Sequence, residues 1–169
     1  MNSPLPDPSA DLALHYEHAF DIRINFDKRW VWPTAGGASI GYTSVGTGCT
    51  VSGPRLNGRL VDHSGADWPI VRADGVVELN AHYVIETDDG AHIYIRNQGY
   101  VHGPLRAPTD PEDAPSIPRY FRCTPYFRAP TGKYDWLNRT VIIGVGARRP
   151  QLAPGDPPDH SLFRYYAVR

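Results

Sequence analysis

The chain has 169 residues and a formal net charge of −1 at pH 7, from 17 basic and 18 acidic side chains. This balance argues against nucleic acid as a partner, and no apolar run approaches the roughly 18 residues of a membrane-spanning helix. The 16 glycines, 17 prolines and 10 tyrosines favour short strands and tight turns over a helical bundle. Cys49 and Cys123 alone supply neither a disulfide framework nor a zinc site, so we expect a reduced, cytoplasmic setting.

The polar, proline-rich residues 1–10 predict a flexible N-terminal arm rather than a signal peptide. Strand-like segments then follow, separated by turn residues, at 20–26, 37–43, 49–62, 76–87, 91–102, 119–128, 140–148 and 161–168. Because no segment shows a sustained helical period, we expect one all-β domain over 11–169, a compact antiparallel β-barrel of about eight strands.

Two proline-rich stretches interrupt the strands, at 104–118 and at 150–160. Proline has no backbone donor and cannot pair inside a sheet, so both stretches are predicted loops. The first is long enough to be a lid over a binding site or a solvated insertion, and the sequence leaves these two readings open.

The strongest hairpin signal is the turn at 88–90. A three-residue loop with Gly90 in the left-handed conformation places Tyr83 opposite Ile95. In this register one face of the hairpin is apolar except for Tyr83 and Asn97, whereas a slip of one residue mixes polar and apolar groups on both faces. We therefore expect the apolar face, with these two polar exceptions, to point into the barrel.

Standard catalytic and nucleotide-binding motifs are absent from the sequence. The histidines at positions 82, 92 and 102 recur every ten residues. His82 and His92 share a face of the hairpin but lie several residues apart and have no third ligand at a recognised spacing, so we expect no metal. The two cysteines are predicted to be small buried hydrophobic residues. Asp67 next to Trp68 is the more specific feature, because an aspartate desolvated beside a large ring can act as a general acid or base. Alternatively, Asp67 caps a turn and Trp68 plugs the end of the barrel.

Arg55 and Arg122 are flanked by strand-like, partly apolar sequence. If they point inward, they could hold a carboxylate, a phenolate or a carbonyl oxygen, and otherwise they form surface ion pairs. Tyr134 and Trp136 alternate with a charged residue in the stretch KYDWLN. They could line the mouth of a pocket for a flat ligand or pack in the core.

Four stretches together carry a resemblance to a known family: GADW, TDDGAHIYIRNQGY, YFRCTPYF and KYDWLN. In their order and spacing they resemble the domain of unknown function 3237, also called the UPF0311 type. The resemblance implies a calycin-like or allene-oxide-cyclase-like barrel that needs no cofactor. Some fungal members are similar to cyclases that add a phenol or alcohol across a prenyl alkene. Where the family usually has Asp-x-Arg-Tyr, this chain has residues 80–83, so His82 replaces an arginine with a group that titrates near neutral pH.

These observations lead to the hypothesis of a cofactor-free barrel enzyme for intramolecular cyclisation or isomerisation of an aromatic or polyketide-like small molecule. Asp67 would be the acid or base and Tyr83 its hydrogen-bonding partner. The expected substrate-binding residues are Arg55, Trp68, His82, Asn97, Arg122, Tyr134 and Trp136. The alternatives are a non-enzymatic carrier barrel and a structural protein with a filled lumen. As partners we expect a small apolar or aromatic ligand and a second copy of the chain in a dimer, but neither nucleic acid nor a membrane.

Overall fold

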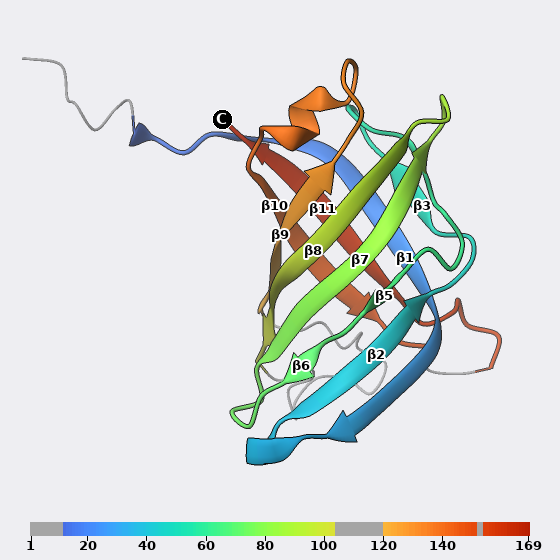
Figure 1. Ribbon diagram of the computed structural model, residues 1–169, viewed down its shortest axis with the longest axis vertical. Helices are drawn as coiled ribbons and strands as arrows, with labels where there is room; N and C mark the ends of the chain where they lie inside the picture. Colours follow the sequence, from blue (N-terminus) through green and yellow to red (C-terminus); the bar gives the residue numbers. More distant parts are fainter. Residues whose placement is uncertain (1–11, 104–119, 152–153) are drawn as a thin grey trace, which may run out of the picture.

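The computed structural model describes residues 12–103, 120–151 and 154–169 (Figure 1). The predicted N-terminal arm and the loop at 104–118 lie outside these described residues, as do two residues of the loop at 150–160. Neither short helical segment in the described ranges is long and apolar enough to span a membrane.

The described residues form one antiparallel sheet of eleven strands. Its strands are β1 (Tyr16–Pro33), β2 (Ser39–Val45), β3 (Thr50–Ser52), β4 (Gly58–Leu60), β5 (Ala66–Asp67), β6 (Ile70–Val71), β7 (Val77–Thr87), β8 (His92–His102), β9 (Tyr120–Arg128), β10 (Ile142–Arg149) and β11 (His160–Val168). The 3-10 helices are η2 (Ala35–Gly37) and η3 (Asp135–Asn138). All eight predicted segments form strands. The count differs because the segment at 49–62 divides into β3 and β4, and the short strands β5 and β6 follow it.

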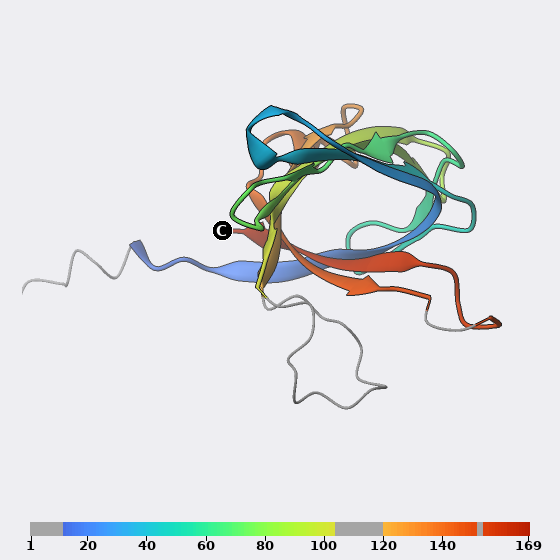
Figure 2. The same cartoon turned by 90° about the horizontal axis from the view of Figure 1, so that it is seen from below.

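The sheet closes on itself because β1 is long enough to pair with different strands along its length. Its first part pairs with β11 and its last part with β2, and β2 reaches β7 through β5 and β6. The ring therefore runs β1–β11–β10–β9–β8–β7–β5–β2 and back to β1, as Figure 2 shows from below. Closure leaves few unpaired strand edges, which are otherwise sites of aggregation. The predicted all-β barrel is confirmed.

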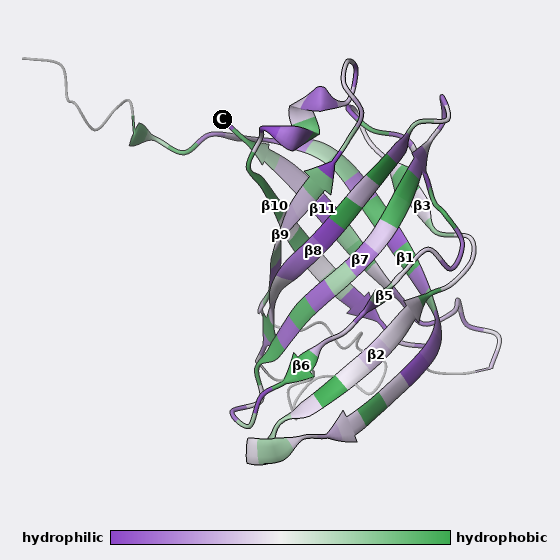
Figure 3. Ribbon diagram, viewed as in Figure 1, coloured by the Kyte–Doolittle hydropathy of each residue, from purple (hydrophilic) through white to green (hydrophobic). Residues whose placement is uncertain are grey.

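The hairpin of β7 and β8 has the predicted register. Tyr83 lies opposite Ile95 and Ala81 opposite Asn97, and Gly90 has a positive φ of 83°, which glycine adopts without steric cost. Hydrophobic and hydrophilic residues alternate along these strands (Figure 3), as expected for a sheet with one face on the core.

Buried side chains cluster inside the barrel towards the β7–β8 turn, the end that is uppermost in Figure 1. The Phe20 ring stacks on Tyr165 with a centroid distance of 5.0 Å and meets Phe127 edge-on at 6.1 Å. Ile85 and Ile93 are fully buried in the same cluster. Because this end is packed, any ligand space must lie towards the other end, where β2 and β6 form the wall.

Candidate functional site

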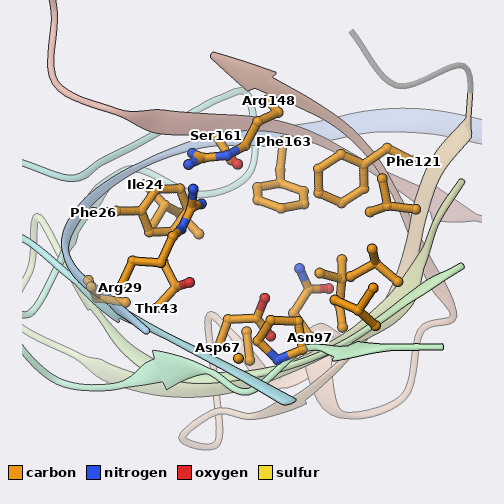
Figure 4. Close-up of a pocket in the computed structure, with 18 of the residues that line it drawn as sticks. Ile24, Phe26, Arg29, Thr43, Asp67, Asn97, Phe121, Arg148, Ser161 and Phe163 are labelled. Atoms are coloured by element: carbon orange, nitrogen blue, oxygen red, sulfur yellow. The ribbon is translucent and has the colours of Figure 1, made fainter. Parts of the chain in front are cut away.

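The barrel contains a cavity of about 420 Å³ (Figure 4), a size that suits a small molecule. Its wall is mostly apolar, with side chains such as Ile24, Leu79, Phe121 and Phe163. Seven polar or charged side chains face into it: Arg29, Thr43, Asp67, Tyr83, Asn97, Arg148 and Ser161. Part of the lumen is therefore open, which favours an enzyme or a carrier over a structural barrel with a filled lumen.

Asp67 is placed in the cavity by β5, which pairs on both sides. Its neighbours across the sheet are Thr43 and Ala81, which also line the cavity. The carboxylate Oδ1 accepts a hydrogen bond of 2.9 Å from the backbone N–H of Asn80. Burial raises the pKa of Asp67 to about 6, against the opposing effects of the Asn80 and Trp68 backbone hydrogen bonds and of the Arg29 charge. The carboxyl group can therefore hold or release a proton near neutral pH.

Tyr83 and Asn97 lie deeper in the barrel, and each side chain is 1% exposed. Among the described residues the Tyr83 hydroxyl has no hydrogen-bond partner of good geometry, although the Tyr165 and Asn97 side chains lie near enough to affect its pKa. Burial raises that pKa, so Tyr83 is a neutral donor. The Asn97 Nδ2 donates to the Tyr165 hydroxyl at 3.1 Å, whereas its Oδ1 is an unpartnered acceptor within the described chain.

The Arg148 guanidinium lies across the cavity from Asp67 and Asn97, and the Arg29 side chain reaches towards it from beside Thr43 (Figure 4). Arg148 extends from the end of β10, and its neighbour across the pair with β11 is Ser161. Its Nη2 forms an ion pair with Asp159, and its guanidinium lies over the Phe26 ring at 4.5 Å from the centroid. The same Asp159 carboxylate lies 3.5 Å from Arg29 Nη1. The cavity thus has the Asp67 carboxyl group on one side and, on the other, two guanidinium groups that meet at Asp159.

Neither arginine is among the binding residues predicted from the sequence, for two different reasons. In β1 the register shifts between Phe26 and Arg29, and such a bulge changes which face the following residues occupy. Strict alternation from Phe26 would turn Arg29 outward, so no local sequence pattern identifies Arg29 as a residue that faces the cavity. Arg148 continues the inward alternation of Gly144 and Gly146 in β10, and this parity could have revealed it.

Three of the predicted binding residues lie around η3 at the filled end of the barrel (Figure 1) and do not line the cavity. The Arg55 guanidinium lies over the Trp136 ring, 3.6 Å from its centroid, and its Nη1 donates to Glu17 at 3.0 Å. The Tyr134 hydroxyl donates to Asp89 at 2.8 Å. These contacts hold η3 against the barrel, in agreement with the packing alternative.

The remaining three lie outside the cavity lining as well. Trp68 is 44% exposed and packs edge-on against Tyr42 at 4.7 Å, so the suggestion that it plugs the barrel end is wrong. His82 Nδ1 lies 2.6 Å from the Tyr94 hydroxyl, and Arg122 donates to a backbone carbonyl. His82 and Arg122 alternate along their strands with the residues that line the cavity, so their side chains point to the other face of the sheet. Of the predicted site residues, Asp67, Tyr83 and Asn97 are the ones that the structure brings together.

Both cysteines are free and buried, as predicted. Burial raises the pKa of the Cys123 thiol to about 12, so it stays protonated and is a poor nucleophile. No cluster of three or more metal-ligating side chains occurs in the part of the chain that the structure describes.

Residues 14–168 match the model of the family described as "Protein of unknown function (DUF3237)". The chain belongs to this family. A UPF0311 protein of Clostridium acetobutylicum is 32% identical over 170 residues, which cover 92% of this chain and 94% of the relative. A solved structure of a conserved protein of unknown function from Rhodopseudomonas palustris has a TM-score of 0.75 and 27% identity, with 93% and 99% of the two chains covered.

Two fungal matches are more distantly similar to this chain. The hydroalkoxylation enzyme phnH of Penicillium herquei is 27% identical over 99 residues, which cover 59% of this chain and 52% of that protein. The crystal structure of an enzyme from the same fungus has a TM-score of 0.65 with 20% identity over 99% of this chain and all of that one. This last likeness concerns the fold alone.

Proposed function

We propose that this protein catalyses an intramolecular cyclisation of the hydroalkoxylation type, or a related isomerisation, by acid–base catalysis with its own side chains. The observation that carries the proposal is the Asp67 carboxyl group, whose pKa burial raises to about 6, inside a largely apolar cavity. A group with this pKa exchanges protons efficiently near neutral pH. The similarity to a protein named as a hydroalkoxylation enzyme supports the same reaction class.

The proposed step conserves all atoms of the substrate. The protonated Asp67 carboxyl transfers its proton to one carbon of an alkene, and the cation that forms on the other carbon is attacked by a hydroxyl oxygen of the same molecule. A C–O bond forms, and the hydroxyl proton returns to the Asp67 carboxylate. The product is a cyclic ether with the mass of the substrate, and the acid is regenerated.

The rest of the cavity favours this chemistry by orienting the substrate and excluding water. The unpartnered Oδ1 of Asn97 can accept a hydrogen bond from the attacking hydroxyl, and the neutral Tyr83 hydroxyl can donate one to a substrate oxygen. The apolar walls exclude water, which would otherwise compete with the hydroxyl group for the short-lived cation. Holding hydroxyl and alkene together in the reactive conformer lowers the barrier by several kcal/mol in comparable intramolecular reactions.

The test is to incubate the protein with ortho-prenylphenol and to look for dimethylchroman, its cyclic isomer of unchanged mass. In deuterated water the product should carry one deuterium on carbon, because the proton on Asp67 exchanges with solvent. Asp67→Asn keeps the shape but removes the acid, and we expect turnover to fall by about a hundredfold or more. Asp88→Asn, on an exposed residue of the β7–β8 turn, is the matched control and should retain full activity.

A carrier of apolar small molecules is the second candidate, because the cavity wall is mainly hydrocarbon. In that case the ligand would bind and be recovered unchanged, without deuterium. Turnover that persists in Asp67→Asn would instead show that another group supplies the proton and that Asp67 is not the catalytic acid.

A further inference from the structure

The two arginines of the cavity carry more positive charge than their own partners neutralise. Arg29 and Arg148 both contact Oδ2 of Asp159, and no other ion pair of either arginine occurs among the described residues. Two guanidinium groups therefore share one carboxylate, which leaves one formal positive charge in the cavity as long as Asp67, whose pKa is about 6, is protonated.

That charge lies in a poorly solvated place. The Arg148 side chain is 17% exposed, and one face of its guanidinium is covered by the Phe26 ring. Burial, together with the neighbouring Arg29, lowers the pKa of Arg148 despite the attraction of Asp159. A buried charge without full compensation is costly, and an anion placed beside it offsets that cost.

A specific donor is available for such an anion. Arg148 Nη1 is buried and lacks a hydrogen-bond partner within the described ranges, while Nη2 of the same group is held by Asp159 Oδ2. Asp159 Oδ1 is a buried acceptor that also lacks a partner there. Ser161 lies directly across the strand pair from Arg148, faces the same cavity and is 3% exposed. Its hydroxyl adds a second donor that can turn towards the same point (Figure 4).

We infer that the cavity binds an apolar ligand that carries a single negative charge on an acidic oxygen. This oxygen accepts hydrogen bonds from Arg148 Nη1 and from the Ser161 hydroxyl. The role of this anion site rests on the proposed function, in which it anchors the substrate across the cavity from Asp67. Binding measurements alone can nevertheless test the site. The shared chemistry is an acidic oxygen, which a carboxylate or an acidic phenol can supply. Arg29 contributes long-range attraction from the edge of the site, where its side chain is 50% exposed.

The experiment compares two acids with neutral partners of the same shape. Naphthoate is titrated against naphthamide, and para-nitrophenolate against para-nitroanisole, at about pH 8 by calorimetry, both in the wild-type protein and in Asp67→Asn, which lacks the carboxylate that is ionised at this pH. Hydrogen bonds to a charged group contribute about 1.5–3 kcal/mol, so we expect at least one acid to bind about tenfold or more tightly than its neutral partner. The acid with the larger preference identifies the carboxylate or the phenolate as the natural group. Equal affinities within both pairs, or no binding of any of the four compounds, would overturn the proposal.

Two variants test the position of the anion. Arg148→Met should abolish the preference for the acid, whereas Arg149→Met, on the next residue of β10 and outside the cavity lining, should retain it. If Arg148→Met does not fold, Asp159→Asn gives an independent result, because it removes the neutralising carboxylate and should increase the preference. A preference that survives Arg148→Met, or that falls in Asp159→Asn, contradicts the assignment.

Asp67→Asn separates this inference from the proposed function. It should retain or increase the affinity for naphthoate, because it removes a negative charge from the opposite wall, although it abolishes turnover. A protein that prefers the acids but never forms the cyclic ether supports the anion site and refutes the proposed reaction.

Discussion

At the scale of single residues, the cavity combines groups whose environments differ strongly. Asp67 is an acid whose ionisation is made unfavourable by burial, while Arg148 keeps a charge that is only partly compensated. Tyr83 and Asn97 present polar atoms without partners in the described part of the protein. Unsatisfied polar groups are costly in a folded core, and their concentration in one cavity is typical of a site that a ligand completes.

The raised pKa of Asp67 predicts a pH-dependent stability. The pKa of Asp67 is 3.8 in the unfolded chain and about 6 in the folded protein. Between these two pH values the native state therefore binds more protons than the unfolded state. The contribution of Asp67 to the stability of the fold is therefore largest below pH 4 and is lost as the pH rises through 6. Relative to Asp67→Asn, the wild-type protein should lose about 2.4 kcal/mol of unfolding free energy between pH 4 and pH 8. Urea unfolding at both pH values measures this difference, and a constant difference would contradict the assigned pKa.

The two buried tyrosines should respond differently to loss of the hydroxyl. Tyr83→Phe removes a group without a well-formed hydrogen bond, so we expect stability to stay equal or to rise by up to about 1 kcal/mol. Tyr165→Phe removes the acceptor of Asn97 Nδ2 and should cost about 1–3 kcal/mol. Thermal unfolding of both variants tests the contrast, which would be refuted by a larger loss in Tyr83→Phe.

At the scale of elements, irregular points in the strands decide which side chains reach the cavity. The bulge after Phe26 turns Arg29 inward, and the double pairing of β5 places Asp67 between β2 and β7. Gly65, just before β5, allows this close approach, because a Cβ built there would lie 1.7 Å from the carbonyl oxygen of His82.

Gly65→Ala should therefore displace β5 from β7 and disturb Asp67 as well as the fold. We expect a loss of about 3 kcal/mol or more, at the upper end of overpacking effects. Gly90→Ala provides the comparison, since its Cβ would meet open space and only the positive φ is unfavourable, at about 1–2 kcal/mol. Chemical unfolding of the two variants gives the measurement, and similar losses would show that the close contact at Gly65 relaxes freely.

At the scale of the whole molecule, the barrel has a packed end and a hollow end. The core cluster with Phe20, Tyr165 and Ile85 closes the first, and the cavity occupies the second beneath two strands of only two residues each, β5 and β6. Stability is distributed in the same way, because few backbone hydrogen bonds hold these short strands.

Hydrogen exchange should reveal this gradient. The central amides of β7 and β8, such as those of Ile85 and Ile95, should exchange only through global unfolding. The amide of Gly41, which donates to the Pro69 carbonyl at 2.7 Å beside β6, should exchange faster through local opening. Mass spectrometry or nuclear magnetic resonance on the native protein provides the rates, and equal protection at both ends would contradict the division.

The sequence by itself predicted the eight longer strand segments, the all-β class and the β7–β8 register, and the reason is local. Alternation of apolar and polar residues sets the face of each strand, and Gly90 sets the turn. It also singled out Asp67, Tyr83 and Asn97, because a carboxyl beside a large ring and polar groups on an apolar face are visible along the chain.

Only the tertiary structure decided which arginines face the cavity. Arg55 and Arg122 have strand-like surroundings, yet Arg55 stacks on Trp136 and Arg122 points away. Arg29 and Arg148 meet at Asp159, although they are far apart in the sequence. Their meeting depends on a bulge in β1 and on the closure of the barrel, and both arise from pairing between distant strands that no local pattern records.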